Sequence, residues 1–514
     1  MPVERGEPVV VTDAGAVRGF WRDERGAASA AFLGIPFAAP PVGELRFGSP
    51  RPHPPWQGVQ PATAYGPTPQ RVPFSEVTAI PEPTIPGTST LNVNVFTPAP
   101  DPQARLPVLV WIHGGGFVAG SPASPWYDGR SFNRDGVVTV TVSYRLGFEG
   151  FGWIDGAPPN RGVLDWLAAL EWVQRNVAAF GGNPDRVTIA GQSAGGAAVL
   201  RLLTMPAAQH LFHGVIAASA PEVSATAEDA AALARRVAGR LGVEPTREGF
   251  AARSEAQIIE VQSVRVGGAD GTGEDESGGE TADAVDGLIG MAIAPRVLGP
   301  VIDGDLVPGR LVEAMASGVG ADKPLLLGTV ANEFTLAPFA VADALGEIDL
   351  AAVLIRLGLG AAAARAHLDR WAGRPAAWML GQAATDLLFR RHVPTWAGTR
   401  QARVAGRSGE PTWVYDFAWL SPTGPEPAAS HCLDLPFAFD ALDAERVSAL
   451  AGPHPPQELA DAVHGDWVSM ITTGRVDAPS FDGRPGTGGA TVRYDATPRA
   501  VVPDGYAAEA RLGS

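Results

Sequence analysis

Short apolar segments alternate with segments of helical periodicity between residues 107 and 219. Two of the apolar segments, 107–113 (PVLVWIH) and 137–145 (VVTVTVSYR), are rich in β-branched residues, which is typical of strands buried on both faces. Residues 186–191 (RVTIAG) predict a third strand, which runs directly into a segment of helical composition. Because strands and helices alternate, the pattern predicts βα units around a mostly parallel sheet.

Residues 164–180, which lie between two of these strands, predict an amphipathic helix that ends at Gly181-Gly182. Its apolar residues follow the i, i+3, i+4, i+7 spacing of a helix with one buried face, and they are Leu164, Leu167, Ala168, Leu170, Val173 and Val177. Farther along, 323–330 (KPLLLGTV) and 412–419 (TWVYDFAW) predict two more strands. The expected fold class is therefore α/β, with a mostly parallel central sheet flanked by helices.

Two stretches outside the predicted strands, residues 223–262 and 343–400, are rich in Ala, Leu and Arg and have helical periodicity. Between them, residues 267–287 are acidic and contain few apolar side chains, so we expect a mobile loop there. We expect a single elaborated domain over residues 1–514, with cap or lid insertions at about 223–290 and 343–400 that pack over one edge of the sheet.

Composition excludes several classes of protein. Hydrophobic residues make up 45% and charged residues 18% of the chain, which is the balance of a globular protein with a large core. The formal net charge of −16 opposes binding to phosphate backbones or anionic lipid, so we expect no nucleic-acid partner. The beginning of the chain has no signal-peptide pattern, and no stretch approaches 18 uninterrupted apolar residues. We expect a cytoplasmic monomer or homodimer that does not bind a membrane.

Ser193 is the candidate nucleophile, because residues 191–195 (GQSAG) fit the pattern G-x-S-x-G between a predicted strand and a predicted helix. The flanking glycines allow a sharp turn that lifts the serine oxygen above the sheet, and the amides at the start of the helix favour negative charge. Residues 113–117 (HGGGF) also follow a strand, and their glycines allow backbone amides to face a reacting carbonyl. The predicted oxyanion hole consists of the amides of Gly115, Gly116 and Ala194.

A serine hydroxyl needs a base, and in this arrangement the acid and then the histidine follow the serine along the chain. The candidate histidines after the serine are His210, His213, His367, His392, His431, His454 and His464. His431 is preferred because it lies in the loop after strand 412–419, and His454, which lies among prolines, is the alternative. His367, His392 and His464 lie in sequence of helical character, where a structural histidine is the usual case.

Glu333 is the preferred acid because it follows the strand 323–330 at the same edge of the sheet as the other predicted loops. Asp303 and Asp305 are the alternatives, although their sequence, PVIDGDLVP, favours a turn. Cys432 is the only cysteine, which excludes an intrachain disulfide. We expect it to be a buried bystander, since nothing beside it resembles an activating turn. No sequence motif for a metal or nucleotide is present, so we expect no metal and no cofactor.

Several of these segments together resemble the type-B carboxylesterase family, over most of the chain. They are GIPFAAPPVGELRF (34–47), FGGNPDRVTIAGQSAG (180–195), GTVANEF (328–334) and SHCLDLPFAF (430–439). The resemblance implies an α/β-hydrolase fold and supports Ser193, Glu333 and His431 as a catalytic triad. It also implies that Ser219 is a buried serine near the triad, although Ala220 replaces the family's usual glycine.

The chain departs from the family pattern in three further ways. Thr90 stands where cysteine is usual, so the corresponding disulfide is absent. Gln192, beside the nucleophile, replaces the glutamate of the cholinesterases, and the segment before residue 89 has no obvious choline-binding tryptophan. Choline esters are therefore not the expected substrate.

The sequence predicts a serine carboxylesterase for esters of small to medium acyl or aryl groups, with a small-molecule ester as its partner. Hydrolysis of amides or carbamates by the same triad is an alternative, because nothing in the triad distinguishes the leaving group. A non-catalytic binding protein of the same fold is a further alternative, although all three triad residues are present. Candidate residues for the substrate pocket are Phe117, Trp126 and members of the segment 343–400.

Overall fold

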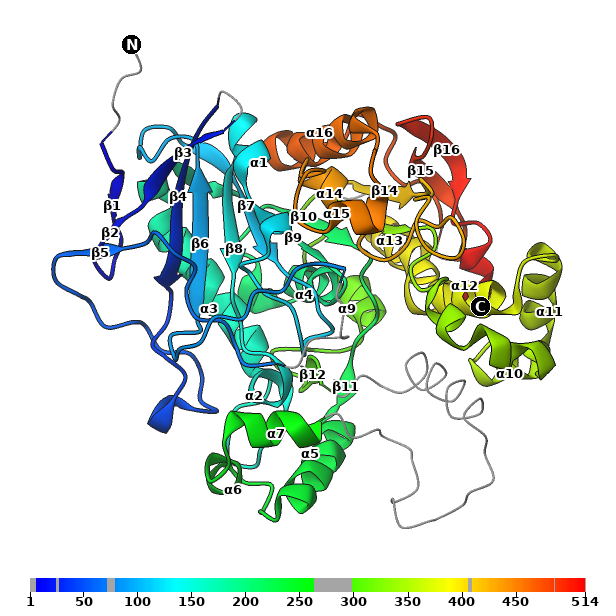
Figure 1. Ribbon diagram of the computed structural model, residues 1–514, viewed down its shortest axis with the longest axis horizontal. Coiled ribbons are helices and arrows are strands. Elements are labelled where there is room, and N and C mark those ends of the chain that lie inside the picture. Colours follow the sequence, from blue (N-terminus) through cyan, green and yellow to red (C-terminus); the bar gives the residue numbers. More distant parts are fainter. Residues whose placement is uncertain are drawn as a thin grey trace.

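The structure is a computed structural model that describes residues 6–24, 27–71, 79–262, 298–404, 409–484 and 486–513. Within these residues, eleven strands form one central sheet (Figure 1). In spatial order the strands are β16 (Ala500–Gly505), β15 (Gly489–Tyr494), β14 (Thr412–Phe417), β13 (Leu325–Val330), β10 (Gly214–Ala218), β9 (Gly182–Gln192), β7 (Leu106–Ile112), β8 (Val138–Val142), β6 (Asn92–Thr97), β4 (Ala27–Pro36) and β3 (Phe20–Glu24).

The middle of this sheet is parallel. Each neighbouring pair from β15 to β8 runs in the same direction, whereas β16 at one end and β6, β4 and β3 at the other are antiparallel to their neighbours. The five strands predicted from the sequence are all present as members of the parallel part. The predicted mostly parallel α/β arrangement is therefore confirmed.

Alternate side chains of β7 divide the hydrophobic core into two layers. Val108, Val110 and Ile112 belong to one apolar cluster, which includes residues of the helices α3 (Arg161–Asn176), α4 (Ala194–Leu203) and α13 (His392–Val404). Leu109 and Trp111 belong to a second cluster, which includes residues of α14 (Leu435–Ala438) and α16 (Gln457–Thr473). Helices therefore cover both faces of the sheet, which explains the continuous apolar character of its central strands.

The predicted amphipathic helix is α3, which begins three residues earlier than expected. Its last predicted turn, Val177–Phe180, is a 3-10 helix, and the chain leaves the helical conformation at Gly181. The buried residues of α3 include Trp166, Leu170 and Val173, which pack in the core cluster beneath the sheet.

The described parts of the predicted insertions are mostly helical. The first contains α5 (Ala227–Leu241), α6 (Arg247–Ala251) and α7 (Glu255–Gln262), and it lies at the bottom of Figure 1. The second contains α10 (Leu350–Arg356), α11 (Ala361–Arg370) and α12 (Ala376–Thr385), and it lies on the right beyond β16. The predicted acidic loop, 267–287, lies outside the described residues. The division of the chain into one domain with two caps stays a prediction.

The remaining elements are short. A small sheet contains β1 (Val9–Val11), β2 (Ala16–Arg18) and β5 (Val59–Pro61), and a two-stranded ladder joins β11 (Ala225–Thr226) to β12 (Val301–Ile302). The other helices are α1 (Arg130–Arg134), α2 (Gly147–Phe151), α9 (Leu311–Ser317) and α15 (Val447–Ala451). In the described part of the chain, no helix combines the length and apolar character that crossing a membrane requires.

Candidate active site

Ser193 occupies a sharp turn between β9 and α4. Its backbone has φ of +57° and ψ of −122°, a conformation that is unfavourable for a residue with a side chain. Its amide donates to the carbonyl of Ala218 at 2.9 Å, which ties the turn to the end of the neighbouring strand β10. A Cβ atom at Gly195 would lie 2.0 Å from the carbonyl oxygen of Ile112, so only glycine fits there. The second glycine of the motif therefore allows α4 to start directly against β7.

Two hydrogen bonds join His431 to Glu333. Nδ1 of His431 is hydrogen-bonded to Oε2 of Glu333, and the backbone amide of His431 donates to the carbonyl of Glu333 at 3.0 Å. The other carboxylate oxygen, Oε1, accepts from the amide of Val330 at 3.1 Å, and Glu333 is 3% exposed. Both residues follow strands of the parallel sheet, β14 for His431 and β13 for Glu333. The carboxylate is thus placed to fix the tautomer and the orientation of the imidazole.

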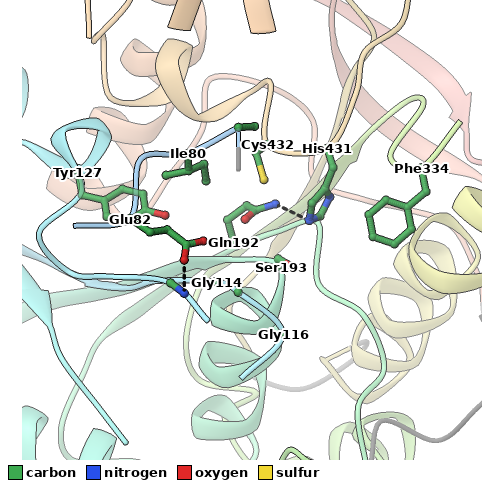
Figure 2. Close-up of a pocket in the computed structure, with 13 residues that line it drawn as sticks. Ile80, Glu82, Gly114, Gly116, Tyr127, Gln192, Ser193, Phe334, His431 and Cys432 are labelled. Atoms are coloured by element: carbon green, nitrogen blue, oxygen red, sulfur yellow. Dashed lines mark hydrogen bonds between the residues drawn. The ribbon is translucent and has the colours of Figure 1, made fainter. Parts of the chain in front are cut away.

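The opposite ring nitrogen of His431 faces the pocket. Its Nε2 atom lies 3.2 Å from the side-chain nitrogen of Gln192, the residue before Ser193 (Figure 2). The rings of Phe334 and Phe389 pack against the imidazole, each with its centroid 5.2 Å from that of His431.

The pKa of His431 reflects this surrounding. Burial alone would lower it, because the protein interior solvates a charged imidazolium poorly. Contacts with Cys432 and Glu333 outweigh burial, so the pKa of His431 is raised well above its ordinary value.

The glycine loop after β7 lies beside Ser193. Gly114, Gly115 and Gly116 line the same pocket as Ser193 and His431. The loop is closed by the amides of Val118 and Ala119, which donate to the carbonyl of Gly115 at 3.1 and 2.9 Å. Among the described residues, the amides of the predicted oxyanion hole, those of Gly115, Gly116 and Ala194, donate to no other group. They are therefore available to a bound anion or carbonyl oxygen.

These groups converge on one pocket of about 840 Å³, part of which is open to solvent. Its described lining consists of Ala79, Ile80, Glu82, Gly114, Gly115, Gly116, Gly120, Tyr127, Gln192, Ser193, Phe334, His431 and Cys432. In Figure 2, Ser193 lies at the centre, with Phe334 and His431 on one side and Ile80, Glu82 and Tyr127 on the other. The size suits a small-molecule ligand.

The sequence-based prediction of the pocket walls was wrong. Phe117 and Trp126 are fully buried in the core, and no described residue of 343–400 lines the pocket. The prediction that Cys432 is buried is confirmed, but Cys432 also lines the pocket and is therefore no bystander. Phe334 was missed although it directly follows Glu333 in the sequence. Glu82 comes from a proline-rich segment in which no motif points to it.

The alternative residues have contacts typical of structural roles. His464 is hydrogen-bonded to the carbonyl of Ala438 and to Asp135, both at 2.8 Å. His392 stacks on Trp396, and Nε2 of His367 lies 2.8 Å from the carbonyl oxygen of Met379.

The remaining predicted residues do not line the pocket. Asp303 accepts turn hydrogen bonds from the amides of Asp305 and Val307, as its sequence suggested, and His454 is exposed. Ser219 is fully buried directly after β10, and its amide donates to Gly328 at 2.7 Å. Within the described part of the chain, its hydroxyl has no hydrogen-bond partner, and it does not line the pocket.

Comparisons with known proteins agree with this geometry. The profile of the carboxylesterase family matches residues 6–480. The para-nitrobenzyl esterase of Bacillus subtilis is 34% identical in an alignment of 476 positions that covers 91% of this chain and 90% of that protein. The phenmedipham hydrolase of Pseudarthrobacter oxydans is 31% identical in an alignment of 500 positions, and the alignment covers 91% of this chain and 90% of the relative.

Solved structures support the same assignment. A carboxylesterase of Geobacillus stearothermophilus matches with a TM-score of 0.80 and 28% identity over 98% of each chain. A PNB esterase structure matches with a TM-score of 0.75 and 30% identity over 97% of this chain and 98% of that chain. These matches confirm the α/β-hydrolase fold and the family resemblance inferred from the sequence. The chain belongs to the carboxylesterase family and is a carboxylic ester hydrolase.

Proposed function

We propose that the protein hydrolyses carboxylic esters of small to medium acyl or aryl groups through an acyl-enzyme on Ser193. One observation carries the proposal. A serine on a strained turn shares its pocket with a histidine that a buried carboxylate orients, and with a glycine loop whose amides donate to no described group. This combination provides a nucleophile, a base and a site for an oxyanion.

In the first half of the reaction, Nε2 of His431 takes the hydroxyl proton of Ser193 while Oγ attacks the ester carbonyl. The carbonyl oxygen becomes an oxyanion that the amides of Gly115, Gly116 and Ala194 stabilise. As the tetrahedral intermediate collapses, the bond to the alcohol oxygen breaks and His431 gives the proton to that oxygen. The alcohol leaves, and the acyl group stays on Ser193.

Water completes the reaction by the same route. His431 removes a proton from water, whose oxygen attacks the acyl carbonyl and forms a second oxyanion in the same position. Collapse of this intermediate breaks the bond to Oγ, and the proton returns from His431 to Ser193. The products are the carboxylic acid and the alcohol, and no cofactor takes part.

Ser193→Ala tests the proposal. We expect hydrolysis of p-nitrophenyl acetate and butyrate to fall by about 10⁴- to 10⁶-fold while the protein stays folded. A fluorophosphonate probe should label the wild type at Ser193 and leave the variant unlabelled. Retained hydrolysis or labelling in a folded variant would overturn the mechanism. Because one relative is named a para-nitrobenzyl esterase, p-nitrobenzyl esters are suitable further substrates, and matched amides and carbamates test the alternatives.

A further inference from the structure

Glu82 is the only acidic residue among the described residues that line the pocket. It lies on the opposite side of Ser193 from Phe334, on a wall that it shares with Ile80 and Tyr127 (Figure 2). The wall is otherwise apolar or aromatic, and the proposed mechanism gives this carboxylate no role. A carboxylate in such a place needs a partner, because an unpaired charge in an apolar surrounding is costly.

The protein provides partners for one of its two oxygens. Oε2 of Glu82 accepts a hydrogen bond from the amide of Gly120 at 3.1 Å and lies 3.5 Å from Nε of Arg71. The exposed fractions of the two side chains are 12% for Glu82 and 2% for Arg71. Within the described residues, no group donates to the second oxygen, Oε1. Among the described groups, the carboxylate is therefore held through Oε2, and no described donor competes with a ligand for Oε1.

The guanidinium of Arg71 does not contact Oε1 of Glu82 in any described hydrogen bond. Its terminal nitrogens donate to the carbonyl oxygens of Pro69, Glu82 and Pro83 at 3.2, 2.9 and 2.9 Å and to the hydroxyl of Thr68 at 3.3 Å. The guanidinium thus holds its own loop together, and it is Glu82 rather than Arg71 that lines the pocket.

The charge of Glu82 acts on its neighbours in the pocket. Burial raises the pKa of the Tyr127 hydroxyl well above its ordinary value, and Cys432 and Glu82 raise it further. A negative charge that makes a neighbouring group harder to deprotonate also favours a cation beside it. The net charge of −16 adds a long-range attraction for cationic ligands.

We propose that Glu82 is a specificity-determining residue, whose available carboxylate oxygen accepts a hydrogen bond from a primary or secondary ammonium group on the ester substrate. Amine-bearing esters are then hydrolysed in preference to neutral esters of the same shape. Since a quaternary ammonium keeps the charge but has no N–H to donate, we expect a weaker preference for it. This inference rests on the proposed function.

Matched pairs of esters test the proposal. 4-(Aminomethyl)benzyl acetate and 4-ethylbenzyl acetate differ in charge on the alcohol side, and the p-nitrophenyl esters of 4-(aminomethyl)benzoic and 4-ethylbenzoic acid differ on the acyl side. We expect kcat/KM at neutral pH to favour the ammonium member of at least one pair by about tenfold or more, which is the value of one charge-assisted hydrogen bond. The trimethylammonium analogue, which keeps the charge but cannot donate a hydrogen bond, should show a smaller advantage than the primary ammonium. Equal rates within both pairs would overturn the proposal.

Glu82→Gln should abolish the preference. The change keeps an oxygen for the amide of Gly120 and removes the charge, and the ratio within a pair does not depend on the amount of folded enzyme. Glu228→Gln removes the same charge from an exposed position on α5 and should keep both the preference and the activity. A preference that survives in Glu82→Gln would contradict the assignment.

Ligand binding can be measured without catalysis. The measurement also does not require that the Glu82→Gln variant folds. Benzylammonium and benzyl alcohol are titrated into the Ser193→Ala protein by calorimetry. We expect benzylammonium to bind about tenfold more tightly, and equal affinities would overturn the proposal. If the wild type hydrolyses no ester but benzylammonium binds preferentially, the proposed function fails while the role of Glu82 as a cation-binding residue stands.

Discussion

The side-chain nitrogen of Gln192 lies 3.2 Å from Nε2 of His431. Because Nδ1 of the same ring is bonded to Glu333, a neutral imidazole with its proton on Nδ1 presents a lone pair at Nε2 to the amide of Gln192. The proposed mechanism requires that lone pair to accept the proton of Ser193. Gln192 thus contacts the atom on which the chemistry depends, and it does so without adding a charge.

Gln192→Glu should move the acid limb of the pH profile upward. The new carboxylate would stabilise the imidazolium and raise the pKa of His431 further, whereas only the neutral imidazole acts as a base. We expect the acid limb of kcat/KM for p-nitrophenyl butyrate to shift to higher pH by about one unit, which corresponds to about 1.4 kcal/mol. Gln192→Met, which keeps the size of the side chain but adds no charge, is the control and should shift the limb less. An unmoved limb in Gln192→Glu would exclude contact between these side chains in the working enzyme.

Glu333→Gln should move the acid limb of the pH profile to lower pH, opposite to the shift expected for Gln192→Glu. Without the carboxylate the pKa of His431 falls, so the imidazole stays neutral to lower pH and the acid limb moves down. The rate nevertheless falls, by about 10⁴-fold in kcat, because the amide no longer fixes the tautomer with Nδ1 protonated.

Asp303→Asn is the matched control for Glu333→Gln. Asp303 was one of the two alternative acids in the sequence, and its carboxylate accepts turn amides. We expect kcat and the pH profile to stay at wild-type values in this variant. A large loss of kcat in Asp303→Asn with normal activity in Glu333→Gln would transfer the role of the acid to Asp303.

Gly115→Ala should impair the proposed oxyanion hole. Gly115 has φ of +111°, and a Cβ atom there would lie 2.2 Å from the carbonyl oxygen of Ala119, so the loop must shift. Displacement of one donor is expected to lower kcat by about 10²- to 10³-fold with a smaller effect on KM. The control is Gly136→Ala. Gly136 also has a positive φ, of +77°, but no atom lies within 4 Å of the Cβ that the substitution adds. Equal losses of kcat in the two variants would show that backbone strain, and not the oxyanion hole, is responsible.

The sequence was sufficient to predict a strand where an apolar run along the chain coincides with burial on both faces. The central strands β7, β8 and β9 are buried on both faces, so their apolar runs stand out along the chain. The edge strands were not predicted because they are short and half exposed, as in β1, where only the middle of three residues is buried. Ser193 and its glycines were found because the sharp turn needs those residue types at that spacing.

The pocket walls could not be predicted in the same way. Phe117 and Trp126 lie close to the glycine loop in sequence, but their large apolar side chains are buried in the core. The walls come instead from loops such as 79–82, whose position depends on long-range contacts. Glu82, for example, is placed by Gly120 and Arg71, and nothing in its local sequence indicates that pairing.

Asp165→Asn should destabilise the whole protein, because it breaks a buried ion pair. Oδ2 of Asp165 accepts from the backbone amide and Nε of Arg145 at 3.0 and 2.8 Å, and Oδ1 accepts from Nη2 at 2.7 Å. The exposed fractions of the two side chains are 4% for Arg145 and 0% for Asp165. Loss of the carboxylate leaves a buried guanidinium without its counter-charge, so we expect the free energy of unfolding in urea to fall by about 3–5 kcal/mol.

Asp185→Asn, which breaks an exposed pair with Arg105 at 3.4 Å, is the control and should lower the free energy of unfolding by less than about 1 kcal/mol. Similar losses in the two variants would show that burial does not set the strength of the Arg145–Asp165 pair.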